Sequence, residues 1–345
     1  MHRQFGSTGL RIPPVVFGTS CLGNLYDIVP DATKSSLVSE YIRSVPSPAA
    51  VDSAGKYGAG LALEVLGREL AARNVSPDDV LISNKLGWYR VPLTNAEPTF
   101  EPGAWKGLMF DAEQRISADG IIQCYEQGCR LLGNYRPSLV SVHDPDEYLA
   151  AALDEKDKQR RWNDILGAYR SLFELKKQGK VNAVGIGSKD WKVIRSLTDA
   201  VPLDWVMFAV SFTILEHPKE LIAFIAGLHA RGIGMINSAV FHAGFLTGGK
   251  YFDYRVLSPN DPNDAALFSW REKFNTICTR FGVTPAAACV QFAMSAPGIA
   301  SIALNTGNPK RVAENVSLAT ASIPDGFWKS MKEERLIDRD YPYVE

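Results

Sequence analysis

Residues 50–83 read AVDSAGKYGAGLALEVLGRELAARNVSPDDVLIS, and this stretch decides the fold. It holds two short runs, Ala50-Val51-Asp52 and Val80-Leu81-Ile82-Ser83, on either side of a segment with helical periodicity from Leu61 to Asn74. Two such runs joined by a helix are typical of parallel strands with a crossover helix. The stretch therefore predicts one strand–helix–strand unit of an α/β protein.

The same alternation continues along the rest of the chain. Further runs of this kind are Val15-Val16-Phe17, Leu139-Val140-Ser141-Val142, Ala183-Val184-Gly185-Ile186, Val206-Met207-Phe208-Ala209-Val210, Gly234-Met235-Ile236-Asn237 and Ile299-Ala300-Ser301-Ile302-Ala303. Helical periodicity returns in segments such as Gly120 to Leu132, Trp162 to Gln178, Lys219 to Arg231 and Pro285 to Ala293. The chain therefore predicts eight strand–helix units, which favour an α/β fold of the (β/α)8 TIM-barrel type.

A doubly wound open sheet is the alternative arrangement of such units. Its first strand is usually followed by a glycine-rich turn that binds a dinucleotide. Here that turn reads Gly18-Thr19-Ser20-Cys21-Leu22-Gly23, which lacks the glycine spacing. The barrel is therefore the preferred interpretation.

The ends and loops of the predicted barrel can also be placed. Arg3-Gln4-Phe5 and Leu10-Arg11-Ile12 flank the turn Gly6-Ser7-Thr8-Gly9, which predicts a β-hairpin at the bottom of the barrel. Two long connections, 87–117 and 241–263, would lie on the catalytic face, where long βα loops carry function. No linker or repeat divides the chain, so residues 1–345 are predicted to form one domain.

Composition excludes several classes of protein. The 345 residues are 46% hydrophobic and 22% charged, and 37 basic against 38 acidic side chains leave a formal net charge of −1. This composition supports a large core and argues against disorder and against nucleic acid as a partner. The N-terminus lacks the apolar stretch of a secretory signal, and no run is long enough to span a membrane. We expect a cytoplasmic protein with a small-molecule substrate and no membrane partner; no oligomeric state is predicted.

Polar residues at the predicted strand ends indicate chemistry. Asp52 ends the second strand, Lys85 follows the third, and His143 ends the fourth, while Tyr57 stands in the loop after Asp52. Each of these residues would be ordinary alone: Asp52 as a helix cap, Lys85 as a solvated residue at the rim and His143 as a turn residue. The carboxyl ends of neighbouring barrel strands, however, converge on one mouth of the barrel. A nearby ammonium favours the phenolate of a tyrosine and would lower its pKa from about 10 toward working pH. The sequence therefore predicts Tyr57 as a proton donor or acceptor.

Other kinds of site find less support. No Gly-x-Ser-x-Gly elbow indicates a serine hydrolase. His217, His229 and His242 are scattered without ligand spacing, and the cysteines offer no Cys-x-x-Cys pair. We therefore predict no metal site.

These segments resemble the aldo-keto reductase family over nearly the whole chain. Residues 51–58 are similar to the family's "Asp-Thr-Ala-x-x-Tyr-Gly" segment, and Leu66-Gly67-Arg68-Glu69-Leu70 continues it in register. Residues 82–87 resemble the strand with the catalytic lysine, and 139–144 the strand with the catalytic histidine. The resemblance implies a catalytic tetrad of Asp52, Tyr57, Lys85 and His143. It also implies NAD or NADP bound to a barrel without a Rossmann fingerprint.

The resemblance further implies which residues bind the cofactor. They are Gly18, Thr19, Asp52, Ser188, Ser238 and Phe241 around the strand ends, and Asn305, Thr306, Gly307, Lys310, Arg311, Glu314 and Asn315 in the segment that would hold the adenosine phosphate. That segment also has Asn308 and Pro309 in helix-starting positions, where a helix N-terminus favours anions. Gly187-Ser188 replaces a common Ser-Asn, Ser238 replaces a stacking aromatic residue, and Asn305 replaces a lysine of many NADP-using members. NAD and NADP both remain candidates.

Two loops indicate a subgroup and a substrate. Residues 239–248 and 105–111 are similar to aldose 1-dehydrogenases of the L-fucose, L-galactose or D-threo-aldose kind, which form lactones. The resemblance implies substrate contacts at Trp88, Trp105, His143 and His242. Aromatic loop residues with few charges independently favour a substrate with an apolar face and hydroxyl groups, such as a pyranose. The alternatives are a broad NADPH-dependent aldehyde and ketone reductase and a non-catalytic, cofactor-binding regulatory subunit.

Overall fold

A computed structural model describes residues 2–253 and 255–345, so Met1 and Tyr254 lie outside the described residues. Eight parallel strands close a barrel, and each predicted run lies on one of them. In order around the barrel the strands are β3 (Val15–Gly18), β4 (Ala49–Ala54), β5 (Val80–Leu86), β8 (Leu139–His143), β9 (Ala183–Ser188), β10 (Trp205–Ala209), β11 (Gly234–Ser238) and β14 (Ile299–Leu304). The predicted (β/α)8 barrel is confirmed.

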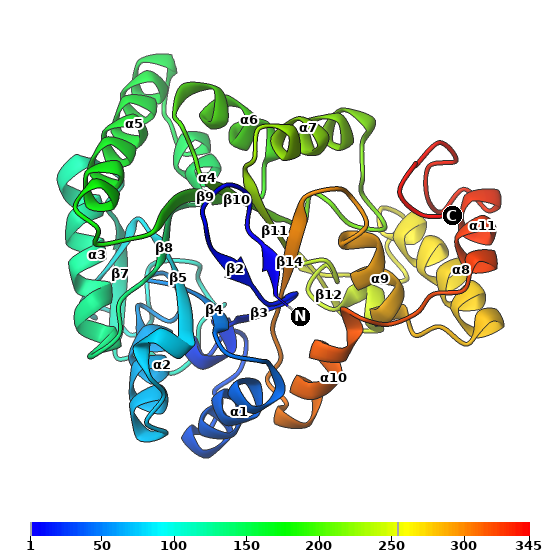
Figure 1. The fold of residues 1–345 in the computed structure, drawn as a ribbon, viewed down its shortest axis with the longest axis horizontal. Helices are drawn as coiled ribbons and strands as arrows, with labels where there is room; N and C mark the ends of the chain where they lie inside the picture. The colour runs from blue at the N-terminus through cyan, green and yellow to red at the C-terminus, as the bar shows by residue number, and fades with distance from the viewer. Residues whose placement is uncertain (1, 254) are drawn as a thin grey trace.

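Helices surround this barrel (Figure 1). They are α1 (Asp31–Ser44), α2 (Leu61–Ala72), α3 (Ala118–Leu132), α4 (Pro145–Ala150), α5 (Glu155–Lys177), α6 (Trp191–Ala200), α7 (Lys219–Ala230), α8 (Ala265–Phe281), α9 (Pro285–Ala293), α10 (Val312–Leu318) and α11 (Asp325–Glu333), with 3-10 turns η1 (Ser20–Gly23), η2 (Pro77–Asp79), η3 (Phe245–Thr247) and η4 (Pro309–Arg311). The helix predicted from Trp162 begins earlier, at Glu155. Its first two turns are almost entirely polar, so they lack the apolar periodicity on which the prediction relied. Asp154 caps it by accepting a hydrogen bond from the Asp157 amide.

The predicted N-terminal hairpin closes the bottom of the barrel. Strands β1 (Arg3–Gln4) and β2 (Arg11–Ile12) pair antiparallel and lie across the barrel end where the strands begin (Figure 1). Phe5 is fully buried and packs against Trp205, with ring centroids 6.1 Å apart. Gly6 has a φ of +52°, and a Cβ there would lie 2.3 Å from the Gly234 amide nitrogen. Only the opposite end of the barrel is left to receive a ligand.

The structure corrects the predicted end of the sixth strand and adds detail to the first long connection. Val210 was expected in a strand, but β10 ends at Ala209 and Val210 has a φ of +55°. The chain turns here because the Ser211 amide hydrogen-bonds the Ala209 carbonyl at 2.7 Å, a local contact that β-branched composition does not reveal. The first long connection is not all loop, since β6 (Trp88–Pro92) and β7 (Phe110–Gln114) pair antiparallel. This pairing joins residues far apart in sequence, which local patterns cannot show.

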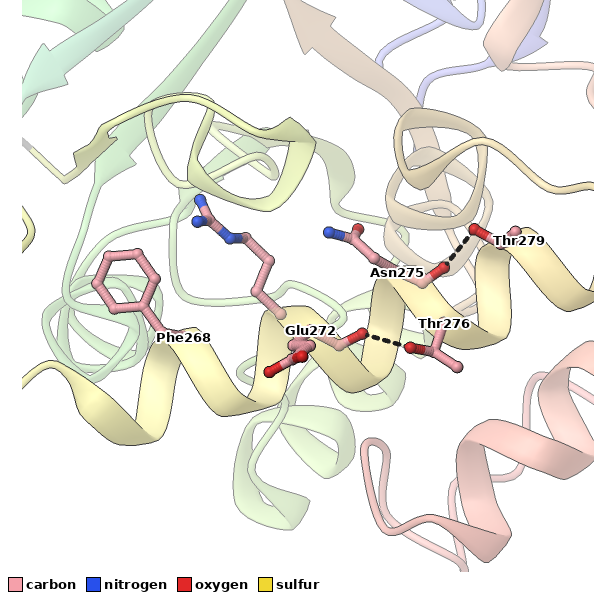
Figure 2. Close-up of a pocket in the computed structure, with 6 residues that line it drawn as sticks. Phe268, Glu272, Asn275, Thr276 and Thr279 are labelled. Carbon is pink, nitrogen blue, oxygen red and sulfur yellow. Dashed lines mark hydrogen bonds between the residues drawn. The ribbon is translucent and has the colours of Figure 1, made fainter. Parts of the chain in front are cut away.

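The second long connection is tied to the outer helix α8. It contains η3 and the short pair β12 (Tyr251–Phe252) and β13 (Arg255–Val256). Arg271 of α8 donates to the carbonyls of Phe245 and Gly249 at 3.2 and 3.1 Å. Arg271 is also one of the residues that line a hollow on α8, together with Phe268, Glu272, Asn275, Thr276 and Thr279, which Figure 2 shows. All these residues belong to one helix and none to a barrel strand, so the hollow is distinct from the barrel mouth.

Candidate active site

Asp52 and Lys85 form a buried ion pair at the open end of the barrel. Strand register sets Asp52 opposite Ser83 and Ala54 opposite Lys85. The Lys85 ammonium donates to one Asp52 oxygen, and the Ser83 hydroxyl donates to the other at 3.0 Å. Asp52 and Lys85 are each only 3% exposed, so each charge depends on the other to offset its lost hydration.

Gly187 makes room for the lysine. A Cβ at position 187 would lie 3.0 Å from Lys85 Cδ, tighter than nearly all real contacts. Gly187 also pairs in register with His143 on the neighbouring strand. A serine at position 187 would therefore require the Lys85 side chain to shift.

Tyr57 and His143 complete a cluster of four. The Lys85 ammonium lies 4.7 Å from the centroid of the Tyr57 ring, and the Tyr57 and His143 rings meet edge-on with centroids 5.8 Å apart. His143 is buried, and its Nδ1 has no hydrogen-bond partner among the described residues. Burial, aided by Lys85 and Lys56, lowers the pKa of His143 well below its usual value, so the ring is neutral at neutral pH.

The prediction that a nearby Lys85 lowers the pKa of Tyr57 toward neutral pH is wrong. Burial, followed by the charges of Asp52 and Asp144, raises the pKa of Tyr57 well above its usual range. Burial is the largest of these causes, and the Lys85 ammonium is itself paired with Asp52. Tyr57 therefore keeps its proton at neutral pH.

A second charged cluster beside the four was not found from the sequence. Lys56 is 2% exposed, and its ammonium lies 2.6 Å from Glu101, 3.3 Å from Asp144 and 2.8 Å from Glu147. Burial by itself would lower the pKa of Lys56, but the three carboxylates together raise it above its usual range. Its position between Gly55 and Tyr57 in the matched segment was the available signal. Its partners are too distant in sequence to have been paired with it.

Of the two predicted substrate-contacting tryptophans, Trp105 lies beside Tyr57 and Trp88 lies earlier in the same loop. The Trp105 ring is 5.8 Å from the Tyr57 ring, and Trp105 Nε1 donates to Glu101 at 2.7 Å. Trp88 packs against Phe100 with ring centroids 5.7 Å apart. The first long loop therefore forms an aromatic wall next to the cluster of four.

The structure does not bring His242 to this cluster. Its side chain is fully buried, with Nδ1 2.8 Å from Asp253 and Nε2 2.9 Å from Thr213. The ring also stacks on Phe252, with centroids 4.7 Å apart. Both ring nitrogens are engaged, so His242 braces the second long loop, and a direct substrate contact finds no support in this geometry.

Three predicted cofactor-contacting hydroxyls donate to the protein itself. The Thr19 hydroxyl donates to the Asp52 carbonyl at 3.0 Å and the Ser188 hydroxyl to the Asp146 carboxylate at 2.7 Å. The Ser238 hydroxyl donates to the Phe208 carbonyl at 2.8 Å. Phe241 lies half-buried on the loop that follows. Ser188 Oγ in addition accepts from the Asp190 amide at 3.2 Å, so its hydroxyl is engaged both as donor and as acceptor.

The segment after the last barrel strand fits a phosphate-bearing cofactor. Leu304 pairs with Phe17, which sets Asn305 beside Gly18, where a Cβ would lie 3.4 Å from Asn305 Cβ. The remaining predicted positions here are exposed or half-buried: Asn305, Thr306, Gly307, Lys310, Arg311, Glu314 and Asn315.

Lys310 and Arg311 carry the positive charge of this segment. Both are exposed, and no ion pair engages either of them in the part of the chain that the structure describes. Two exposed cations without an ion-pair partner among the described residues, in a segment that also contains Gly307, suit the anionic phosphates of a dinucleotide.

Neither a metal-binding cluster nor a membrane-spanning helix is found among the described residues. Within residues 2–253 and 255–345, no group of three or more His, Cys, Asp or Glu side chains is arranged to hold a metal ion. Among the helices described, none combines the length and apolar character needed to cross a membrane.

Known proteins similar to this chain are dehydrogenases and reductases. Pyridoxal 4-dehydrogenase of Microbacterium luteolum is 28% identical, with 97% of both chains covered. D-threo-aldose 1-dehydrogenase of Pseudomonas sp is 26% identical, with 96% of both covered. L-galactose dehydrogenase of Arabidopsis thaliana is 24% identical over 92% of this chain and 88% of its own.

Solved structures agree on the fold. A glycerol dehydrogenase from Gluconobacter oxydans has a TM-score of 0.70 at 17% identity and covers 99% of this chain and 96% of its own. An aldo-keto reductase from Bacillus halodurans has a TM-score of 0.69 at 17% identity, with 100% and 99% covered. Residues 14–335 match the aldo/keto reductase family. The resemblance seen in the sequence is thus confirmed, and the chain belongs to the aldo/keto reductase family of NAD(P)-dependent oxidoreductases.

Proposed function

We propose that the protein oxidises the anomeric carbon of an aldose to a lactone. The observation that carries this proposal is the cluster of Tyr57, Lys85, Asp52 and His143 beside an aromatic wall. NAD(P), when bound, supplies the carbon that accepts or returns the hydride. The unpaired cations Lys310 and Arg311 would hold its phosphates.

In this proposal Tyr57 moves the proton. During oxidation Tyr57 must first lose its own proton, which, with its raised pKa, is favoured by high pH; the phenolate then takes the proton of the anomeric hydroxyl while the carbon loses hydride, which leaves the carbonyl of the lactone. During reduction the protonated Tyr57 donates to the carbonyl oxygen, consistent with its raised pKa. Neutral His143 donates a hydrogen bond to the reacting oxygen, and the Lys85–Asp52 pair sets the electrostatic surroundings of the phenol.

The mouth favours a ring-shaped substrate. Trp88 is half-buried and can supply an apolar face on which a pyranose stacks, while Tyr57 and His143 meet its hydroxyl groups. Two of the relatives act on sugars by name, D-threo-aldose 1-dehydrogenase and L-galactose dehydrogenase. Pyridoxal is a second candidate, because it is also a ring that carries hydroxyl groups, and the 28% identical relative is named for it.

A substrate panel tests the proposal. We expect formation of reduced nicotinamide, followed by its absorbance, with at least one of L-fucose, L-galactose and D-arabinose when NAD⁺ or NADP⁺ is supplied, whereas turnover of pyridoxal alone would favour the second candidate. Failure of every sugar with both cofactors, alongside efficient reduction of simple aryl aldehydes by NADPH, would establish the broad reductase instead. Cofactor binding without turnover on the whole panel would support the regulatory subunit.

Cofactor preference is expected to depend on Arg311. Arg311→Ala should weaken NADP⁺ binding more than NAD⁺ binding, since a guanidinium can pair with the 2′-phosphate that only NADP⁺ carries. The loss should be about 1.5–3 kcal/mol, as for a hydrogen bond to a charged group. Titration of each cofactor by fluorescence measures it, with Lys329→Ala, an exposed cation on α11, as the control. Equal weakening of NAD⁺ and NADP⁺ binding would show that Arg311 does not contact the 2′-phosphate.

A further inference from the structure

Asp144 has an unusual backbone conformation directly after His143. It stands between the end of β8 and the start of α4, where a capping residue normally has an extended backbone and a side chain bonded to the first turn of the helix. Here the backbone is left-handed, with φ +45° and ψ +54°, and the side chain makes no capping hydrogen bond. The Asp144 carboxylate therefore has a role other than capping, and its contacts indicate which.

One oxygen of Asp144 has three nitrogen-bearing neighbours. Oδ2 lies 3.3 Å from the Lys56 ammonium, 3.5 Å from His143 Nε2 and 3.9 Å from the Lys189 ammonium. Lys56 and Asp144 are 2% and 6% exposed, so their opposite charges hold each other in place. Lys56 and Lys189 also help to lower the pKa of His143, so the nearby carboxylate does not turn the ring into a cation.

The two ring nitrogens of His143 have different surroundings. Nδ1 is sealed from solvent and has no partner among the described residues. Nε2 faces the Asp144 carboxylate at 3.5 Å, beyond the usual range of about 2.7–3.2 Å for an N–H···O hydrogen bond. A neutral imidazole carries one ring hydrogen, and a negative charge favours its place on the nitrogen that the charge faces. Asp144 therefore favours hydrogen on Nε2 and, at this distance, leaves that hydrogen available to another acceptor.

We propose that Asp144 is a positioning residue that holds the hydrogen of His143 on Nε2 and so prepares this ring to donate to the reacting oxygen of the substrate. Nε2 is the nitrogen that a ligand can reach, because Nδ1 is sealed from solvent. In the other tautomer Nε2 would present a lone pair to that oxygen and repel it. The inference rests on the proposed function for the task of His143, whereas the tautomer is a property of the protein alone.

Nitrogen NMR of the protein without cofactor or substrate tests the tautomer directly. Protonated and unprotonated imidazole nitrogens resonate far apart, and His143→Gln identifies the signals of His143 among the five histidines. We expect the Nε2–H tautomer in the wild type and a mixture in Asp144→Gly. Asp144→Asn should have the largest share of Nδ1–H, because its amide can donate a hydrogen to Nε2. An unchanged Nε2–H tautomer in both variants, or Nδ1–H in the wild type, would overturn the proposal.

Both variants suit the backbone at position 144. Glycine and asparagine adopt the left-handed conformation more readily than most residues, and no capping bond is lost. Lys56 keeps Glu101 at 2.6 Å and Glu147 at 2.8 Å, so its ammonium is not left unpaired. We therefore expect denaturant midpoints close to that of the wild type. Asp78→Asn, which makes the same chemical change at an exposed aspartate, is the control.

Kinetics test whether the tautomer matters for the reaction. We expect kcat/KM to fall about tenfold in Asp144→Asn, the effect of reducing the donor tautomer to about one tenth of the population, and less in Asp144→Gly. Asp78→Asn should behave as the wild type. Wild-type kcat/KM in a variant whose tautomer has changed would overturn the positioning role. If the wild type turned over no sugar and no pyridoxal, the proposed function would fail, and NMR would still decide the tautomer.

Discussion

Tyr57→Phe is expected to lower kcat by roughly 10²–10⁴, the usual effect of losing a positioned proton-transfer group. The substitution removes one hydroxyl and little volume, so the free energy of unfolding should change little. The ring contacts of Tyr57 with Trp105 and His143 use the face and edge that phenylalanine retains. Steady-state turnover, with cofactor binding measured separately, checks the prediction.

A matched variant separates chemistry from packing. Tyr89→Phe removes the hydroxyl of a half-buried tyrosine on β6, whose ring lies 3.9 Å from the Arg115 guanidinium. We expect Tyr89→Phe to turn over like the wild type. Near-wild-type turnover in Tyr57→Phe would reject the proposed catalytic role of Tyr57.

Lys85→Met is expected to reduce both activity and stability. It leaves the Asp52 carboxylate buried without its counter-ion, which should lower the free energy of unfolding by about 3–5 kcal/mol. The remaining negative charge also disfavours the phenolate of Tyr57 and raises its pKa further. Oxidation needs Tyr57 to accept a proton, so the rise of kcat with pH should move to higher pH. Denaturant unfolding and a pH–rate profile measure the two effects.

The double variant Asp52→Asn/Lys85→Met distinguishes an electrostatic role from a packing role. Removing both charges should restore much of the stability lost in Lys85→Met, because no buried charge is left unpaired. Activity should stay low, since the ammonium is still missing. If the pH–rate profile of Lys85→Met matched that of the wild type, Lys85 would not influence the ionisation of Tyr57.

Much of the fold was determined by the sequence alone. Each barrel strand is a local run such as Val80–Ser83, and each is followed by a segment with its own helical period, so nearest neighbours in the chain were sufficient. The meeting of Asp52, Lys85 and His143 was predictable for the same reason. Parallel strands of a closed barrel bring their carboxyl ends together whatever the loops do.

Only the tertiary structure decided which charges and rings are paired. Lys56 reaches Glu101 and Glu147 across 45 and 91 positions of the sequence (101 − 56 and 147 − 56), and no local pattern connects them. The engagement of His242 by Thr213 and Asp253, and the raised pKa of Tyr57, likewise depend on burial. Hydration lost and neighbouring charge gained are properties of a three-dimensional arrangement, whereas residue type and spacing report only on local structure.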